Sequence, residues 1–456
     1  MIPAYTRCNQ QIAVLGLGVS GISAVQALEA GGAKVFAWDE DENSRKRANS
    51  LNISLTSPTS SKWKSAEALL LSPGIPPNHP IPAAAQKYGK PIIGDIELFL
   101  ENVSQGTIIG ITGTNGKSTT ASLIFHILQS SGLPVQIGGN FGPAALGLNP
   151  PSPEEIIVLE LSSYQLELTR KAMFDIAVVL NVTPDHIERH GSMERYVAAK
   201  KQIFRHDTLS TRKAVIGIDD IHGQRFQREL LENRSWEVFP ISIVSSEVAK
   251  VSAINGILVD SEGPQFDFSE SDNLRGAHNW QNAAAAWMVS RICEVPPKKI
   301  REALKSFNSL PHRLETIAHD GTVRYVNDSK ATNGQAAAKA LSSFKNIYWI
   351  AGGIAKEDGI EPAIPYLDRV IKAFLIGEAA ETFKLILDKH RIPAKICNNL
   401  KDAVVKAQRR AVFDERLNSV VLLSPACASF DQYSNFIQRG EHFKTIIHQL
   451  LQSSSS

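Results

Sequence analysis

Residues 107–120 read TIIGITGTNGKSTT, and this stretch decides the class of fold. The apolar run TIIGIT predicts a buried β-strand, and the helical pattern TTASLIFHILQSSG follows the glycine-rich turn GTNGKS. A strand that runs through such a turn into a helix is the setting of a P-loop, whose backbone N–H groups surround phosphates. The stretch therefore predicts an α/β domain with a parallel sheet and a nucleotide site.

The end of this loop has its own chemistry. Lys117 would neutralise the β- and γ-phosphates, and the Ser118 hydroxyl would reach a Mg²⁺ ion. The loop departs from the usual pattern, because Ile111 stands where a glycine is expected and glycines stand at 110 and 113 instead. The alternative interpretation is a glycine turn with an exposed lysine.

A second glycine-rich turn, GLGVSG, occupies residues 16–21. Gly16, Gly18 and Gly21 fit the pattern G-x-G-x-x-G between a predicted strand and a predicted helix, and Asp39 ends the next strand. Such a turn can hold a pyrophosphate, from NAD or from a UDP-linked compound, and the glycines do not distinguish the two. A tight β–α turn without a ligand is the third interpretation.

The length of 456 residues predicts three domains. Polar and motif boundaries place them at 1–104, 105–309 and 310–456. The first and third segments alternate strands with helices, so each is expected to be a Rossmann-like α/β domain flanking the central P-loop domain.

Composition narrows the class of protein. Hydrophobic residues make up 43% of the chain, charged residues make up 21%, and the formal net charge is +2. Without a long run of one sign, neither a nucleic-acid partner nor a membrane surface is expected.

The four cysteines, Cys8, Cys293, Cys397 and Cys427, are scattered without a CxxC pair, so neither a zinc cage nor a disulfide framework is predicted. The compartment is expected to be reducing. With no signal-peptide core and no apolar run of membrane-spanning length, the chain is predicted to be cytoplasmic. Nothing marks an assembly surface, and a monomer is expected.

Polar residues end two apolar strands of the central segment. Glu160 ends one of them, and Asp185 and His186 follow another. Ligands of parallel sheets lie at the carboxyl ends of strands. Carboxylate and imidazole groups beside a triphosphate predict a Mg²⁺ site there.

Lys200 lies within an apolar stripe. The helix SMERYVAAKKQIF places it at helical spacing among Met193, Tyr196, Val197 and Phe204. One interpretation is a lysine whose stem packs while its ammonium reaches water. The other is a lysine directed at the active site, whose charge would be inverted by carbamylation with CO₂ so that it does not repel Mg²⁺.

Seven motifs together resemble the Mur ligases: GITGTNGKST, LELSSYQLE, NVTPDHIERHGSMERYVAAK, GAHNWQN, LPHRLE, NDSKATN and SPACASFDQ. The resemblance runs from Gly16 to about Gly440. It implies a UDP-binding N-terminal domain, a central ATPase domain, and a C-terminal domain that receives an amino acid.

The stretches DSKATN and SPACASFDQ resemble the branch of the family that adds D-glutamate. That branch implies ATP-driven amide formation between UDP-N-acetylmuramoyl-L-alanine and D-glutamate through an acyl phosphate, in peptidoglycan precursor synthesis. ATP and Mg²⁺ are the implied cofactors. Domain closure is expected, because the acyl phosphate must be kept from water.

The resemblance also implies roles at matched positions. The implied catalytic set is Lys117, Glu160, His186 and Lys200. The implied metal ligands are Ser118, Glu160, His186 and a carbamylated Lys200. The implied ATP contacts are Gly113, Thr114, Asn115, Gly116, Lys117, Ser118, Thr119, Asn279, Asn282, Arg313 and Asp328. The implied uridine contacts are Gly18, Val19, Ser20, Asp39 and Gly74. Asn140 and His186 would bind the muramoyl substrate, and the implied D-glutamate pocket is Lys330, Thr332, Lys356, Ser429 and Phe430.

Three other functions stay open at this point. A nicotinamide-dependent oxidoreductase would use the first glycine turn and leave the P-loop unexplained. A P-loop switch protein would hydrolyse nucleotide without ligation. A sibling ligase would act on L-alanine, a diamino acid, a dipeptide or folate.

Overall fold

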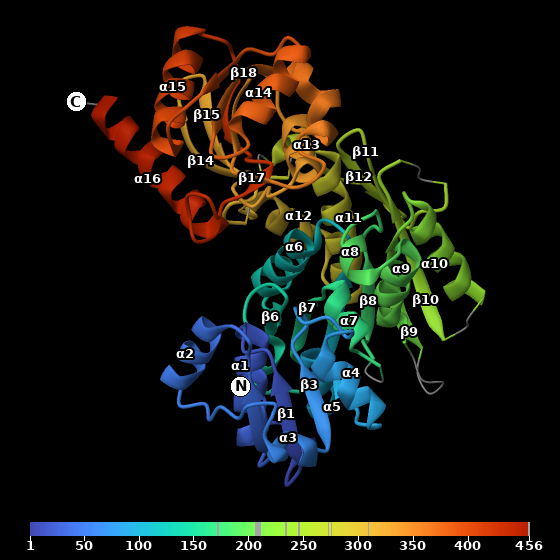
Figure 1. The fold of residues 1–456 in the computed structure, drawn as a ribbon. Helices are drawn as coiled ribbons and strands as arrows, with labels where there is room; N and C mark the ends of the chain where they lie inside the picture. The colour runs from blue at the N-terminus through green and yellow to red at the C-terminus, as the bar shows by residue number, and fades with distance from the viewer. Residues whose placement is uncertain are drawn as a thin grey trace. The chain divides into compact units, whose positions relative to one another are not determined.

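The computed structural model describes residues 1–170, 173–205, 211–232, 235–244, 247–271, 273–274, 276–308 and 310–454. Its contacts divide the chain into two compact units. The first unit comprises Met1–Asp267 and Asn279–Lys305, and the second comprises Phe268–His278 and Ser306–Ser456. Three α/β domains with largely parallel sheets are present, as the sequence predicts: two sheets lie in the first unit and one large sheet lies in the second (Figure 1).

The first sheet has four parallel strands in the order β2-β1-β3-β4. The strands are β1 (Gln11–Leu15), β2 (Lys34–Trp38), β3 (Ala68–Leu71) and β4 (Ile92–Ile93). The helices are α1 (Val19–Ala30), α2 (Glu42–Ser50), α3 (Ser61–Ser65), α4 (Pro80–Lys87) and α5 (Asp95–Asn102). The predicted β–α–β unit at the N-terminus is therefore confirmed, with α1 connecting β1 to its parallel neighbour β2.

The central sheet has nine strands in the order β13-β12-β11-β10-β9-β8-β5-β7-β6. The strands are β5 (Thr107–Thr112), β6 (Val135–Gly139), β7 (Ile156–Glu160), β8 (Ile176–Val179), β9 (Arg212–Gly217), β10 (Trp236–Ser242), β11 (Val251–Ile254), β12 (Ile257–Asp260) and β13 (Gly263–Asp267). Neighbours from β6 to β11 are parallel, and β11, β12 and β13 are antiparallel. The sequence pattern identified only β5, β7 and β8, whose side chains are almost entirely buried; β12 and β13 are partly exposed and carry weaker apolar patterns.

The central region has seven described α-helices, among them those predicted after the P-loop and around Lys200. They are α6 (Lys117–Ser130), α7 (Ser163–Glu167), α8 (Ile187–His190), α9 (Met193–Lys201), α10 (Ile221–Glu232), α11 (Ala277–Ile292) and α12 (Pro297–Ser306). Across the described ranges, none of the helices has both the length and the apolar character needed to cross a bilayer.

The sheet of the second unit has the order β14-β15-β20-β16-β18-β19. The strands are β14 (Glu315–Asp320), β15 (Val323–Asn327), β16 (Ile347–Gly352), β18 (Val370–Ile376), β19 (Ala394–Ile396) and β20 (Ser419–Leu423). Only β14 is antiparallel to its neighbour. A small antiparallel pair, β17 (Ile354–Ala355) and β21 (Cys427–Ala428), follows β16 and β20.

This sheet is covered on both faces, as a doubly wound domain requires. The helices are α13 (Gly334–Ser342), α14 (Ala380–Lys389), α15 (Leu400–Phe413) and α16 (Phe436–Ser454). Alternate side chains of each strand join different apolar clusters: Trp349 packs in one cluster, whereas its neighbours Tyr348 and Ile350 pack in the other.

Candidate functional site

Four predicted site segments follow four adjacent strands of the central sheet. The order β8-β5-β7-β6 places the P-loop beside Glu160 at the end of β7, and Asn140 directly follows β6. The loop 180–186, which carries His186, follows β8. Because these strands are parallel, all four segments leave the same edge of the sheet. We call this the P-loop edge.

The P-loop has the strand–turn–helix geometry that the sequence predicts. Helix α6 begins at Lys117, and Gly116 precedes it in the left-handed conformation with φ of +86°. A Cβ atom at Gly116 would lie 2.1 Å from Asn282 Oδ1, so no larger residue fits this close approach. Lys117 Nζ donates to the carbonyls of Gly113 (2.8 Å) and Thr114 (2.9 Å), and Ser118 is buried. The lysine ammonium is therefore held on its own loop, not extended into solvent.

Asn181, which follows the neighbouring strand β8, holds the P-loop through hydrogen bonds. It was not predicted from the sequence. Its Oδ1 accepts from the N–H of Asn115 (2.9 Å), and its Nδ2 donates to the Asn115 carbonyl (3.3 Å) and to Gln281 Oε1 (2.7 Å). Thr114 donates its N–H to the Asn181 carbonyl. These bonds join residues about 66 to 100 positions apart, which no local pattern could reveal.

The two asparagines of the GAHNWQN motif lie beside the same loop. Thr120 donates its hydroxyl to Asn282 Oδ1 (3.2 Å), and Asn282 Nδ2 donates to Asn279 Oδ1 (3.2 Å). Both asparagines lie on α11 and are buried, and Thr119 in the first turn of α6 is half-buried. The structure thus brings Asn279 and Asn282 next to the predicted phosphate site.

Lys200 is buried to 1% exposure, and the interpretation in which its ammonium reaches water is wrong. Its Nζ donates to the Gly113 carbonyl (2.8 Å), the same oxygen that accepts from Lys117, and lies over the Tyr196 ring. Burial, together with the positive charge of Lys117, lowers the pKa of Lys200 well below its ordinary value. The neighbouring Lys201 is exposed and pairs with Glu229 (2.7 Å).

Glu160 is buried with one oxygen bonded and the other not. Asn140 donates its side-chain amide to Glu160 Oε1 (3.0 Å). Glu160 Oε2 is buried, and among the described residues it has no hydrogen-bond partner. A buried carboxylate oxygen without a donor is costly, and coordination of a cation would satisfy it.

His186 lies at the start of α8 with φ of +54°, half-exposed at the P-loop edge. Its Nε2 is 3.4 Å from Asp185 Oδ2, and its ring lies 5.1 Å from the ring of Tyr164. Strand β8 ends at Val179, so Asp185 and His186 lie on the loop beyond the strand. Its Nδ1 is 3.8 Å from Glu188 Oε1, so both ring nitrogens lie near carboxylates, which places His186 in an acidic part of this edge.

Across the described part of the chain, no three or more His, Cys, Asp and Glu side chains are grouped so as to hold a metal ion on their own. The metal set implied by the sequence contains one Glu and one His. It therefore also needs Ser118, a modified Lys200 and oxygens of the substrates. Mg²⁺ commonly binds in this way, through one or two carboxylates together with phosphate oxygens.

The first glycine turn leaves the edge of the four-stranded sheet. A Cβ atom at Gly21 would lie 1.8 Å from the Gly16 carbonyl, and one at Gly16 would lie 2.6 Å from Ser72 Cβ. At Gly18, which is exposed at the start of α1, a Cβ atom would meet nothing within 4 Å. Close packing therefore requires glycine at positions 16 and 21. At Gly18 the backbone is open to a ligand, as in the phosphate-binding turns of dinucleotide-binding proteins.

The other predicted uridine contacts lie at the same edge. Val19 and Ser20 begin α1, Asp39 follows β2 and Gly74 follows β3. Asp39 accepts from the backbone N–H of Leu17 (2.6 Å) and of Asp41 (2.8 Å), so its carboxylate shapes the glycine turn. Val19 and Gly74 are exposed. This structural role for Asp39 was not foreseen from the sequence.

In the second unit, three adjacent strands end at one group of predicted residues. Asp328, Lys330 and Thr332 follow β15, Ser429 and Phe430 follow β20 and β21, and Lys356 follows β16 and β17. Lys356 and Phe430 are exposed, and Ser429 is buried. We call these positions the C-terminal edge.

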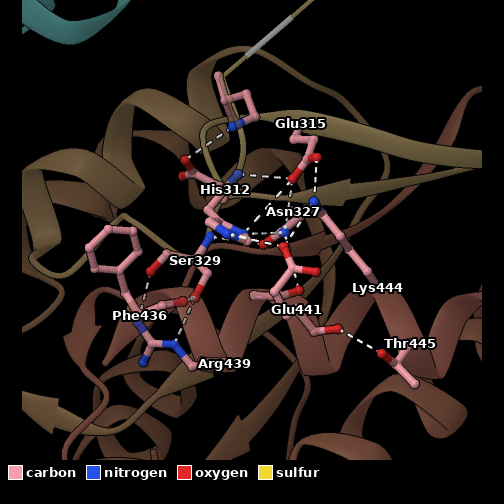
Figure 2. A network of polar contacts seen from close by, with 12 residues as sticks. His312, Glu315, Asn327, Ser329, Phe436, Arg439, Glu441, Lys444 and Thr445 are labelled. Atoms are coloured by element: carbon pink, nitrogen blue, oxygen red, sulfur yellow. Dashed lines mark hydrogen bonds and ion pairs between the residues drawn. The ribbon is translucent and has the colours of Figure 1, made fainter. Parts of the chain in front are cut away.

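Asp328 is buried and bonded within this edge. It accepts from the Ser424 hydroxyl (2.8 Å) and the Leu314 N–H (3.2 Å). Burial raises the pKa of Asp328 to about 7, although the charge of Arg313 opposes the shift. The backbone N–H of Lys330 donates to the backbone carbonyl of His312, and this hydrogen bond joins the LPHRLE and NDSKATN motifs. Figure 2 shows the neighbouring polar network of His312, Asn327 and Ser329 and its connection to α16.

All four cysteines are free in the structure. Cys8 is exposed, Cys293 is partly buried, and Cys397 and Cys427 are buried. This agrees with the expectation of a chain without a disulfide framework.

Comparison with known proteins gives matches along the whole chain. Residues 111–290 match the Mur ligase middle domain, and residues 10–94 match the N-terminal domain described as Mur ligase MurD-like. The UDP-N-acetylmuramoylalanine–D-glutamate ligase of Caulobacter sp. (strain K31) is 43% identical over 464 residues, covering 99% of this chain and 98% of that protein. The enzyme of the same name from Phenylobacterium zucineum (strain HLK1) is also 43% identical, with the same coverage.

Solved structures with this fold share little sequence with the chain. The UDP-N-acetylmuramate–alanine ligase of Thermotoga maritima superposes with a TM-score of 0.60 at 17% identity, covering 98% of this chain and 100% of that one. A pseudomurein peptide ligase type C from Methanothermus fervidus gives a TM-score of 0.55 at 20% identity, covering 97% and 100%. At these identities the likeness concerns the fold alone.

Proposed function

The chain belongs to the Mur ligase family, and from that premise we propose that it joins D-glutamate to UDP-N-acetylmuramoyl-L-alanine at the expense of ATP. The observation that carries the proposal is identity of 43% along the full length to ligases named for D-glutamate. Family membership implies ATP and Mg²⁺. The product is a precursor of peptidoglycan, and we assign the reaction to the cytoplasm.

Two glycine turns serve two nucleotides under this proposal. The open backbone at Gly18 suits the pyrophosphate of the UDP carrier, and the P-loop suits the triphosphate of ATP. The oxidoreductase alternative would use Asp39 to bind a ribose, but both carboxylate oxygens of Asp39 already accept from backbone N–H groups, those of Leu17 and Asp41. The ligase proposal gives both turns a role.

The first step of the reaction brings two anions together, a carboxylate and a triphosphate, and the amide bond forms in the second step. The carboxylate of the carrier substrate attacks the γ-phosphorus of ATP, the bond to ADP breaks, and an acyl phosphate forms. The free amine of D-glutamate then attacks the acyl carbon, and phosphate leaves as the amide forms and the amine loses its proton. Lys117 sits at the P-loop to offset the repulsion between a carboxylate and a triphosphate.

The residues present fit a Mg²⁺ site at the P-loop edge. Glu160 would offer its unbonded Oε2, and the Ser118 hydroxyl, His186 and a carbamylated Lys200 would be the other protein ligands. When bound, Mg²⁺ supplies positive charge that stabilises the oxygens of the transferred phosphoryl group. Asn140, which donates to Glu160 Oε1, would hold that carboxylate in orientation.

We propose that Lys200 carries a carbamate. Its burial and the nearby Lys117 favour the neutral amine, and the neutral amine is the form that adds to CO₂ with loss of a proton. A carbamate keeps one N–H, so the bond to the Gly113 carbonyl can persist. The new carboxylate would bring negative charge to a place where an ammonium would repel the metal.

The C-terminal edge would receive D-glutamate. Lys330 and Lys356 provide positive charge for a dicarboxylate, and Thr332 and Ser429 provide hydroxyl groups. The test is ADP release with UDP-N-acetylmuramoyl-L-alanine as acceptor, comparing D-glutamate, L-glutamate and L-alanine. Of the three amino acids, we expect only D-glutamate to support ADP release. Release with L-alanine would favour a sibling ligase, and release without any amino acid would favour a P-loop switch protein.

A further inference from the structure

Arg439 is one of the largest fully buried side chains in the second unit, with 1% exposure. It lies in the first turn of α16, and the sequence pattern predicted no role for it. Figure 2 shows its guanidinium directed from α16 toward Ser329. A buried guanidinium is unusual enough to require an explanation in terms of what it binds.

The guanidinium connects the two segments that form the C-terminal edge. Arg439 Nε donates to Ser329 Oγ (3.0 Å), and Nη2 donates to the carbonyls of Ser329 (2.9 Å) and Cys427 (3.0 Å). Ser329 precedes Lys330 and lies three positions before Thr332, and Cys427 lies two positions before Ser429. One side chain therefore fixes the spacing between the NDSKATN and SPACASF segments.

The register of α16 is fixed by contacts on either side of Arg439. A Cβ atom at Gly440 would lie 2.2 Å from His312 Nδ1, and Asn327 Nδ2 donates to the Gly440 carbonyl (3.3 Å). Lys444 Nζ lies 2.7 Å from Glu315 Oε1, as drawn in Figure 2. These contacts fix the axial position of α16 and therefore the position of Arg439 relative to Ser329 and Cys427.

The charge of Arg439 has no carboxylate within ion-pair distance in the described part of the chain, since its bonds go to two carbonyls and a hydroxyl. Burial lowers its pKa to about 10, so it remains charged at neutral pH. An apolar side chain of similar size would leave these three buried acceptors without their donor. The carboxylates of Asp431 and Asp328 favour its charged form from beyond ion-pair distance, and the three hydrogen bonds join the two segments through one side chain.

We propose that Arg439 is a positioning residue for the amino acid substrate, holding the Lys330–Thr332 and Ser429–Phe430 segments at the spacing that a dicarboxylate requires. The inference rests on the proposed function, because it takes the C-terminal edge as the D-glutamate pocket. Its buried charge adds to the positive field of Lys330 and Lys356 on that substrate. Arg439 acts through its neighbours and takes no part in bond making.

The test compares Arg439→Lys and Arg439→Met with Arg409→Met, a matched change at an exposed arginine of α15. Lysine keeps the charge but loses the planar fork that reaches both segments. We expect KM for D-glutamate to rise about tenfold or more in Arg439→Lys and further in Arg439→Met, while KM for ATP and for the UDP substrate stays within about twofold. Arg409→Met is expected to behave as wild type.

Ser329→Ala keeps the test decisive if Arg439→Met does not fold. It removes the hydroxyl that accepts from Arg439 Nε and leaves the bond to the Ser329 carbonyl, so a smaller rise in KM for D-glutamate is expected. Hydrogen exchange of the free variants adds a readout independent of ligation. In Arg439→Lys, residues 328–332 and 427–430 should exchange faster together while residues 113–118 are unchanged.

Two results would overturn the inference. One is an unchanged KM for D-glutamate in folded Arg439→Lys; the other is an equal rise in KM for all three substrates with a lower unfolding temperature, which would mean a structural role alone. A wild-type chain without D-glutamate-dependent ADP release would overturn the proposed function and this inference with it. If the wild-type chain ligates D-glutamate and the KM for D-glutamate is unchanged in Arg439→Lys, only the inference about Arg439 is overturned and the proposed function stands.

Discussion

Among single residues, Glu160 shows the sharpest conflict between stability and function. Its buried Oε2 has no hydrogen-bond partner among the described residues, which costs folding free energy, yet the same oxygen is suited to a metal. Glu160→Gln should unfold at the same temperature as wild type or higher, while the ligation rate falls by at least about 100-fold. Thermal unfolding and ADP release measure the two effects. Glu154→Gln, at an exposed position before the same strand, is the control.

A Glu160→Gln variant that retains the wild-type rate would remove this carboxylate from the proposed metal set. A variant that loses both activity and stability would instead indicate that the carboxylate mainly supports the fold.

Lys200 and Lys201 form a natural pair for testing the carbamate. Lys200 is buried against the P-loop, whereas Lys201 is exposed and pairs with Glu229. We predict that Lys200→Ala loses ligation and that added CO₂ or short-chain carboxylic acids partly restore it, because a small carboxylate can occupy the vacated space. Lys201→Ala should retain activity. Full activity of Lys200→Ala without additives would contradict the carbamate.

Asp328 should make the stability of the second unit depend on pH. Its pKa is raised to about 7 in the folded chain, against 3.8 as the ordinary value, so the folded state holds the proton more tightly. The contribution of Asp328 to stability is then largest below pH 4 and is lost as pH rises toward 7, by as much as about 4 kcal/mol at 1.36 kcal/mol per pKa unit. Urea unfolding between pH 4 and 8 should show this slope in wild type and not in Asp328→Asn. Equal slopes in both chains would refute the assignment.

At the scale of elements, the turn before α1 separates a glycine needed for packing from one available to a ligand. Gly21→Ala forces a Cβ atom against the Gly16 carbonyl and should destabilise the chain by about 3 kcal/mol or more. Gly18→Ala meets no atom within 4 Å, so it should fold normally and raise KM for the UDP substrate. Unfolding curves and substrate titrations distinguish the two variants. Normal folding of Gly21→Ala, or an unaffected KM in Gly18→Ala, would be the contrary result.

The sequence predicted those parts of the site that depend on local pattern. The strand–turn–helix at Lys117, the strand end at Glu160 and the buried stripe around Lys200 all follow from spacing along one element. Asn181 and Arg439 could not be found in this way. Their hydrogen bonds join residues from 12 to 110 positions apart, and their importance appears only when strands distant in the chain become neighbours.

The strands, too, divide into those that a local sequence pattern predicts and those that depend on neighbours distant in the chain. Fully buried strands such as β7 and β8 are continuous apolar runs in the sequence, and the sequence predicted them. The antiparallel strands β12 and β14 have half-exposed, mixed patterns and were not predicted. Short or partly exposed strands gain their stability from neighbours, so their own residues carry little signal.

At the scale of the whole molecule, three substrates are assigned to three sheet edges, two in the first unit and one in the second. Under the proposed function, the carrier nucleotide would bind at the glycine turn 16–21, ATP at the loop 113–118, and D-glutamate at segments 328–332 and 427–430. A ligand that binds only the folded state slows local opening where it binds. Each substrate should therefore protect the backbone amides of its own edge from hydrogen exchange.

Hydrogen exchange can follow all three edges in one experiment on the intact chain. UDP-N-acetylmuramoyl-L-alanine should protect residues 16–21, and a non-hydrolysable ATP analogue with Mg²⁺ should protect residues 113–118. Adding D-glutamate to that mixture should then protect residues 328–332 and 427–430, whereas L-alanine should not, because only a dicarboxylate matches the charges of Lys330 and Lys356. Protection of the second unit by L-alanine, or of the first glycine turn by NAD instead of the UDP substrate, would show that the edges are wrongly assigned.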